Sequence, residues 1–180
     1  MSLITKNALL SKRIKMLLPS PTLVLDSKVK DLQQKGIPVI NLGIGEPDFK
    51  TPLNICKAAQ KAIADGFTHY TVTAGIMPLR REIAKKLLKE NNLSYLPQEI
   101  VVGVGSKQLL SNTFLALLNK GDEVLVPIPT WSTYVEQIKL AEARPVLIPL
   151  SPPFKLIGKD IKNHLSHKTK IILLNSLFGK

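Results

Sequence analysis

The sequence predicts an α/β protein with a mixed, mostly parallel sheet and helices on both faces. From residue 99 onward, short apolar runs alternate with segments of helical periodicity, which is the pattern of strands joined by crossover helices. Turn residues separate these runs, as in Asn119-Lys120-Gly121-Asp122. The chain has 180 residues, of which 44% are hydrophobic and 21% charged, so it can bury a core without disulfides or a structural metal.

The first half of the chain is expected to be mostly helical. Gly36 and Gly66 are suited to end the first two helices, because glycine readily adopts the left-handed conformation found after a helix. Leu79, Ile83 and Leu87 form an apolar stripe on the third helix, and the basic residues Arg80, Arg81, Lys85, Lys86 and Lys89 are expected to face away from it. The expected helices are 22–35, 53–65 and 77–91, with a short strand at 39–42 and a loop at 67–75.

The second half is expected to alternate strand and helix. Its apolar runs are too short for helices and are bounded by glycine, proline or polar turns. The expected strands are 99–102, 123–126, 146–150 and 171–174, and the expected helices are 106–118, 132–141 and 158–165. Ligands of open α/β sheets lie at the carboxyl ends of the strands, so these ends are the places to look for a site.

Composition restricts the classes of partner. The net charge of +12 raises nucleic acid as a ligand, but the lysines are spread along the chain and no basic run carries interleaved aromatics, so no nucleic acid is expected. No run of 18 apolar residues is present, so no membrane span is expected. Cys56 is the only cysteine and there are 3 histidines, so neither a disulfide nor a metal site is expected.

Residues 1–21 form a basic arm without an acidic residue before Asp26. Such a segment is compatible with a partly ordered arm and with an organellar transit peptide. A cytoplasmic location is expected, with organellar import left open.

Two segments could carry chemistry. Val102-Gly103-Val104-Gly105-Ser106-Lys107-Gln108 predicts a glycine-containing turn followed by a helix N-terminus, where free N–H groups and the helix dipole favour a phosphate. It matches neither a dinucleotide-binding nor a Walker fingerprint, since Gln108 occupies the place of the third glycine, and an ordinary turn capped by Ser106 stays an alternative. Trp131 follows an apolar strand and is suited to stack on a planar ring, although burial under the loop is favoured when it is considered alone.

Taken together, several segments resemble class I aminotransferases, most closely the aspartate aminotransferase branch of the fold-type I enzymes that use pyridoxal phosphate (PLP). The resemblance extends over residues 15–176 and depends on the order and spacing of the segments. These segments are Gly43–Phe49 with Thr51-Pro52, Tyr70–Ile76 with Leu79-Arg80, Gly105–Gln108, Gly121–Val124 and Pro129–Tyr134.

The resemblance implies roles for individual residues. Gly105, Ser106 and Lys107 would bind the cofactor phosphate, and Trp131 would stack on its pyridine ring. Gly45 would contact the substrate carboxylate. Tyr70 would reach the cofactor phosphate of a partner subunit, since the family forms homodimers with shared sites. The implied reaction transfers an amino group between an amino acid and a 2-oxo acid, with PLP as cofactor.

The sequence also departs from the family. Enzymes of this kind are about twice as long, and the Asn175-Ser176 pair is followed by Leu177–Lys180 rather than the family's proline- and asparagine-rich loop. The Schiff-base lysine, the aspartate beside the pyridine nitrogen and the arginine for the substrate α-carboxylate have no counterpart, so no catalytic residue is assigned.

We therefore expect a truncated aminotransferase that is inactive alone. Residues 1–45 would form an arm and helix belonging to the small domain, and residues 46–180 the first half of the large PLP-binding domain. The alternative is a non-catalytic fragment or interaction protein that keeps only the phosphate loop or the dimer surface.

Overall fold

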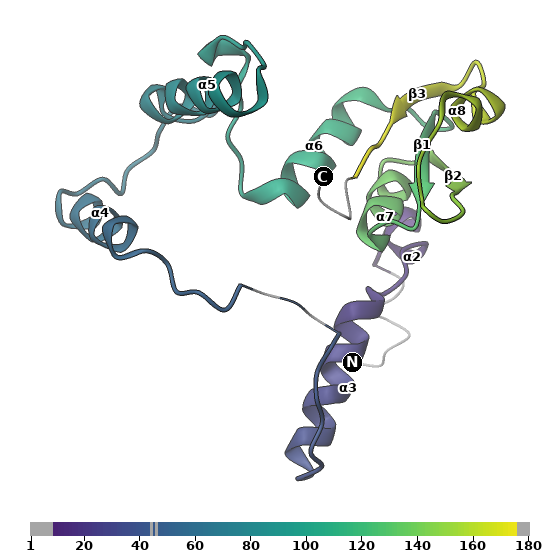
Figure 1. Cartoon of the computed structure of the whole chain (residues 1–180), viewed down its shortest axis with the longest axis horizontal. Helices are drawn as coiled ribbons and strands as arrows, with labels where there is room; N and C mark the ends of the chain where they lie inside the picture. The colour runs from purple at the N-terminus through teal and green to yellow at the C-terminus, as the bar shows by residue number, and fades with distance from the viewer. Residues whose placement is uncertain (1–8, 44, 46, 176–180) are drawn as a thin grey trace. The chain divides into compact units, whose positions relative to one another are not determined.

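The computed structural model describes residues 9–43, 45 and 47–175 (Figure 1). The chain divides into two compact units. One unit combines residues up to Ile44 with those from Leu109 onward, and the other runs from Gly45 to Gln108. Lys6 of the arm, Ile44 and Glu46 of the glycine-rich segment and residues 176–180 lie outside the described residues. The domain boundary expected between residues 45 and 46 stays a prediction.

The first unit is built around a three-stranded parallel sheet. Its strands are β1 (Glu123–Ile128), β2 (Arg144–Pro149) and β3 (Thr169–Ile172), in the order β2-β1-β3. Glu123 pairs with Arg144 at the start of β2 and with Thr169 at the start of β3, and a bulge follows Glu123 in the β1–β3 ladder. The helices are α2 (Lys12–Lys15), α3 (Pro21–Gln34), α7 (Ser132–Leu140) and α8 (Gly158–His164), together with most of α6 (Gly105–Leu117).

The core of this unit lies on one face of the sheet. Val124 and Val126 of β1 pack there with Phe114 of α6 and Ile138 of α7, all nearly or fully buried. Leu125 and Ile148 are equally buried but point to the opposite face, where α8 contacts β2. The connection from β1 to β2 and the connection from β2 to β3 run in opposite directions, so right-handed crossovers put α7 and α8 on opposite faces. The expected α/β class with a parallel sheet is confirmed.

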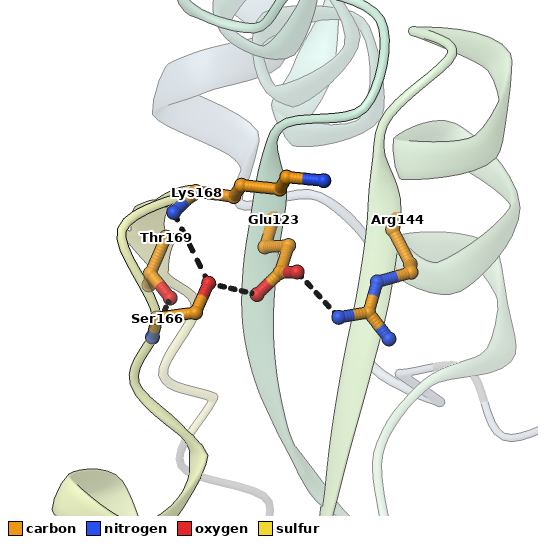
Figure 2. A network of polar contacts seen from close by, with 5 residues as sticks. All are labelled: Glu123, Arg144, Ser166, Lys168 and Thr169. Atoms are coloured by element: carbon orange, nitrogen blue, oxygen red, sulfur yellow. Dashed lines mark hydrogen bonds and ion pairs between the residues drawn. The ribbon is translucent and has the colours of Figure 1, made fainter.

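A buried carboxylate joins the amino ends of the three strands (Figure 2). The Glu123 side chain forms an ion pair with Arg144 of β2 and accepts a hydrogen bond of 2.8 Å from the Ser166 hydroxyl just before β3. The Lys168 N–H in turn donates to the Ser166 oxygen at 3.1 Å. The hydrogen bond from Arg144, followed by the one from Ser166, lowers the pKa of the Glu123 carboxyl from its ordinary 4.5. Glu123 is therefore charged and satisfied although it is buried.

The amino-terminal arm contacts α7 in the same unit. Ser11 accepts a hydrogen bond from Ile14 N–H at the start of α2. A few residues later, the Leu18 N–H donates to the Glu136 carboxylate of α7 at 2.9 Å, and the Lys139 ammonium pairs with the other oxygen of that carboxylate at 2.8 Å. The described part of the arm is therefore held by a specific polar contact.

The second unit contains α4 (Leu53–Ala64), α5 (Met77–Asn91) and a 3-10 turn, η1 (Pro97–Glu99). The helix expected at 77–91 is confirmed to the residue, with Pro78 in its first turn and Asn92 ending it in the left-handed conformation. Arg80, expected to face away from the apolar stripe, is instead buried, because its Nε donates a 2.7 Å hydrogen bond to the Pro97 carbonyl. The guanidinium thus fastens α5 to η1.

Two expected strands are wrong. Residues 39–42 and 99–102 form no strand in the structure, and Glu99 closes η1 instead. A β-strand needs a neighbour for its backbone hydrogen bonds. The N–H groups of Glu99 and Ile100 instead donate locally, to the Leu96 and Pro97 carbonyls, and Val102 N–H donates to the Ala74 carbonyl of a loop. Their apolar composition alone could not predict this.

Candidate functional site

The glycine turn before α6 adopts a defined conformation. Gly105 has a φ of +80°, in the left-handed region that favours glycine, and its N–H donates to the Gly103 carbonyl at 2.9 Å. The Gln108 side chain reaches back and accepts a 2.6 Å hydrogen bond from Val104 N–H. Gln108, which in sequence is only a departure from the dinucleotide-binding fingerprint, therefore fixes the turn.

The turn is anchored to the loop that carries Tyr70. Gly75, with a φ of +99°, packs so closely on Val102 that an added Cβ would lie 2.8 Å from the valine Cβ. The Val102 N–H donates to the Ala74 carbonyl at 3.0 Å. This pairing between residues 74–75 and Val102 lies within one unit and orients the chain as it enters α6. Sequence reasoning missed it, since Gly75 carried no signal beyond its place in a motif.

The backbone around Gly105 suits a phosphate. The first turn of α6 presents N–H groups that have no acceptor within the helix, and the positive end of the helix dipole lies there. No acidic residue occupies this turn, and Gly103 to Gln108 are exposed. The space beside Gly105 is open, with no atom within 4 Å of the position of a Cβ. The structure thus brings Gly105, Ser106 and Lys107 together in a cradle that an anion can approach.

Trp131 lies at the carboxyl end of β1, immediately before α7. Its carbonyl accepts a 3.1 Å hydrogen bond from Tyr134 N–H, which fixes its backbone at the helix start. The side chain is 47% exposed, so the burial favoured for Trp131 alone is wrong, and part of its surface is open to a ligand. The chain leaves β1 toward β2 on one side and returns to β3 on the other, so the carboxyl end of β1 is the switch point at which such sheets bind ligands.

Tyr70 and Gly45 are less defined by their surroundings. The Tyr70 side chain is fully exposed, in the same unit as the turn at Gly105. Gly45 has nothing within 4 Å of the position that a Cβ would take. Both positions are accessible to ligands or to another chain.

Neither a metal site nor a membrane-spanning helix occurs among the described residues. Within residues 9–43, 45 and 47–175, no three side chains of His, Cys, Asp or Glu are arranged to hold a metal ion. No helix in the described part of the chain is both long enough and apolar enough to cross a bilayer.

The family model and the relatives found by sequence comparison are all aminotransferases. The model of the family "Aminotransferase class I and II" matches residues 37–179. The aspartate aminotransferase of Bacillus sp. strain YM-2 is 45% identical over 170 residues, which are 93% of this chain and 43% of that protein. A probable aspartate/prephenate aminotransferase of Aquifex aeolicus is 47% identical over 169 residues, again 93% of this chain and 43% of that protein.

Solved structures agree with this result. The aspartate aminotransferase of Thermus thermophilus with maleate has a TM-score of 0.89 and 38% identity, covering 93% of this chain and 44% of its own. The enzyme of Rhizobium meliloti has a TM-score of 0.89 and 37% identity, covering 93% of this chain and 42% of its own. The chain thus spans less than half the length of the curated relatives it matches, in their N-terminal part. On this combined match of sequence and fold, the chain belongs to the class I and II aminotransferase family.

Proposed function

We propose that this chain forms the N-terminal, phosphate-binding part of an aspartate aminotransferase-like enzyme, which transfers an amino group between an amino acid and a 2-oxo acid. The observation that carries the proposal is the glycine turn at the start of α6, with Gly105 at a φ of +80° and no acidic residue in the first helical turn. When bound, PLP supplies the electron sink for the reaction. The chain's own residues would bind and orient the cofactor and the substrate.

Gly105, Ser106 and Lys107 are proposed to bind the cofactor phosphate. Backbone N–H groups of this turn donate to phosphate oxygens, and the helix dipole contributes about 0.3–1 kcal/mol for each charge. Gln108 and Gly75 are proposed as positioning residues, because they fix the turn and its approach without reaching the phosphate themselves.

Trp131 is proposed to stack on the pyridine ring. Its half-exposed indole at the carboxyl end of β1 supports this role, and aromatic stacking contributes about 0.5–1.5 kcal/mol. Gly45 is proposed to contact the substrate carboxylate, where its open surroundings allow close approach of the backbone. The exposed Tyr70 is proposed to reach the phosphate bound by a second subunit of a homodimer.

The test is a titration of the 180-residue chain with PLP, followed by the fluorescence of Trp131, the only tryptophan. We expect quenching with a dissociation constant in the millimolar range at best, because 1 mM corresponds to about 4 kcal/mol and the turn and one stacked ring together supply no more than that. Ser106→Pro removes one N–H donor yet suits the first turn of a helix, so it should weaken binding several-fold.

The matched control is Lys159→Pro, the same replacement in the first turn of α8. It should leave the titration unchanged. The phosphate role of this turn is wrong if quenching is absent at PLP concentrations up to several millimolar. It is also wrong if Ser106→Pro binds PLP as tightly as the unaltered chain.

A further inference from the structure

Two contacts fasten the segment that leads into α6 onto α5 and the loop before it. Arg80, which is buried in α5, donates from its Nε to the Pro97 carbonyl at 2.7 Å. Five residues further along, the Val102 N–H donates to the Ala74 carbonyl at 3.0 Å. Ile100, which lies between these two contacts, is also buried. The segment is therefore held at both ends, and all of these residues belong to the second unit.

The contact between Gly75 and Val102 leaves no space between the two residues. A Cβ added at Gly75 would lie 2.8 Å from both Cβ and Cγ2 of Val102, whereas carbon atoms pack at roughly 3.5–4.0 Å. The Gly75 N–H donates to the Val72 carbonyl at 2.8 Å, so the turn that presents this glycine is closed by its own hydrogen bond. A displacement of the turn at Gly75 must therefore displace Val102, and the reverse.

This contact lies between two of the residues to which a phosphate role is assigned. On one side, Val102 is three residues before Gly105, and the backbone between them is fixed because the Gly105 N–H donates to the Gly103 carbonyl at 2.9 Å. On the other side, Tyr70 is five residues before Gly75 in the same loop. A continuous path of short backbone segments and one tight contact thus joins the loop of Tyr70 to the turn at Gly105.

We propose that the contact of Gly75 with Val102 couples the phosphate turn of the chain to its Tyr70 loop, so that phosphate bound at the turn fixes the loop. In a homodimer, the Tyr70 that one subunit offers to its partner would then depend on whether the first subunit's own turn is occupied. The roles of the turn and of Tyr70 rest on the proposed function, whereas the coupling rests on the contact itself. Coupling is reciprocal, so loss of the contact also weakens phosphate binding.

The first measurement is hydrogen exchange in the nitrogen-15-labelled 180-residue chain. Inorganic phosphate is the ligand, potassium chloride at equal ionic strength is the control, and the shift of the Gly105 amide gives the dissociation constant. The amides of Gly75 and Val102 each donate to a backbone carbonyl, so their exchange reports the opening of the contact. At ten times the dissociation constant, their exchange should slow about tenfold. The amides of α4, in the same unit, are the internal reference and should exchange at unchanged rates.

The second measurement needs no ligand. Gly75→Ala places a Cβ against Val102, so it should shift the amide resonances of the phosphate turn, Gly105–Lys107. Gly66→Ala is the matched control, because Gly66 also has a positive φ, +78° against +99°, but nothing lies within 4 Å of its added Cβ. Adding Val102→Gly to Gly75→Ala removes the crowded atoms and should return the resonances toward those of the unaltered chain. Gly75→Ala should also weaken phosphate binding several-fold, and Gly66→Ala should not.

Circular dichroism shows whether each variant keeps its fold, and Val102→Gly alone is the second variant if Gly75→Ala does not fold. In Val102→Gly, phosphate should no longer slow exchange at Gly75. The coupling is overturned if Gly75→Ala leaves the turn resonances unmoved, if Gly66→Ala moves them equally, or if phosphate shifts the turn amides without slowing exchange at Gly75. The two proposals fail separately. Turn amides that do not respond to phosphate contradict the proposed function, and the ligand-free variants still decide the coupling.

Discussion

At the scale of single residues, Gly105 and Glu123 each have a structural role that depends on the residue type. Gly105 takes a left-handed conformation that an L side chain adopts only with strain, and Glu123 joins three strands through one buried carboxylate. The first lies at the candidate phosphate turn and the second at the amino ends of the strands. Replacements at the two positions should therefore have different consequences.

Gly105→Ala should destabilise the chain by about 1–2 kcal/mol, the cost of a left-handed conformation for a residue with a Cβ. Space is not the cause, because nothing lies within 4 Å of the added atom. The free energy of unfolding in urea measures the effect. Gly158→Ala is the control, since Gly158 also has open surroundings but no positive φ. Equal stability of the two variants would contradict the conformation assigned to Gly105.

Glu123→Gln should alter how stability depends on pH. The hydrogen bonds from Arg144 and then Ser166 lower the pKa of Glu123 in the folded chain below its ordinary 4.5. The stability that this carboxylate contributes is therefore present above pH 4.5 and is lost as the pH falls through the lower, folded-state pKa. Below pH 4.5, the midpoint temperature of thermal unfolding should fall less steeply with decreasing pH in Glu123→Gln than in the unaltered chain. Glu82→Gln, an exposed surface change, should keep the original slope.

Residue roles were only partly predictable. The turn at Gly105 could be predicted because a strand-like run, glycines and a helix start are all local in sequence. The anchoring of Val102 to Ala74 joins segments 28 residues apart, and the burial of Arg80 depends on a carbonyl 17 residues away, so neither is encoded in a local pattern.

At the scale of elements, helices were more predictable than strands. The helix at 77–91 carries its own signals, namely an apolar stripe and a proline in its first turn. The strands β1, β2 and β3 were located to within about two residues because each is a buried-type apolar run between crossover helices. The runs at 39–42 and 99–102 look similar in sequence, but a strand also needs a partner, which composition does not specify.

Arg80→Ala should loosen α5 from η1 and cost about 1–3 kcal/mol, because the Pro97 carbonyl loses its donor in a partly buried position. Hydrogen exchange of the amides in α5 reports the local effect, and urea unfolding reports its magnitude. The neighbouring Arg81 is exposed and serves as the control. If Arg81→Ala costs as much as Arg80→Ala, the loss arises from helix charge and not from the contact with η1.

At the scale of the whole molecule, the family membership and the partial coverage must be considered together. The match to the Bacillus sp. YM-2 enzyme covers 93% of this chain but only 43% of that protein. The Schiff-base lysine that the resemblance requires is not among the motifs that match.

The 180-residue chain alone should not transfer amino groups. The roles proposed for its residues are to bind and orient the cofactor and the substrate, and none of its residues is assigned to covalent anchoring or proton transfer. The check is turnover of aspartate with 2-oxoglutarate in the presence of PLP, compared with free PLP at the same concentration. Turnover by the pure chain above that blank would mean that a lysine within these residues performs the chemistry.

The central claim, that the turn at Gly105 binds the cofactor phosphate, is tested most directly by nuclear magnetic resonance. The backbone amides of the nitrogen-15-labelled chain are followed during titration with PLP. The account predicts that the amides of Gly105, Ser106 and Lys107 shift most, with one common dissociation constant, and that inorganic phosphate shifts the same amides. Shifts that concentrate at other lysine-bearing segments, with these three amides unmoved, would contradict it.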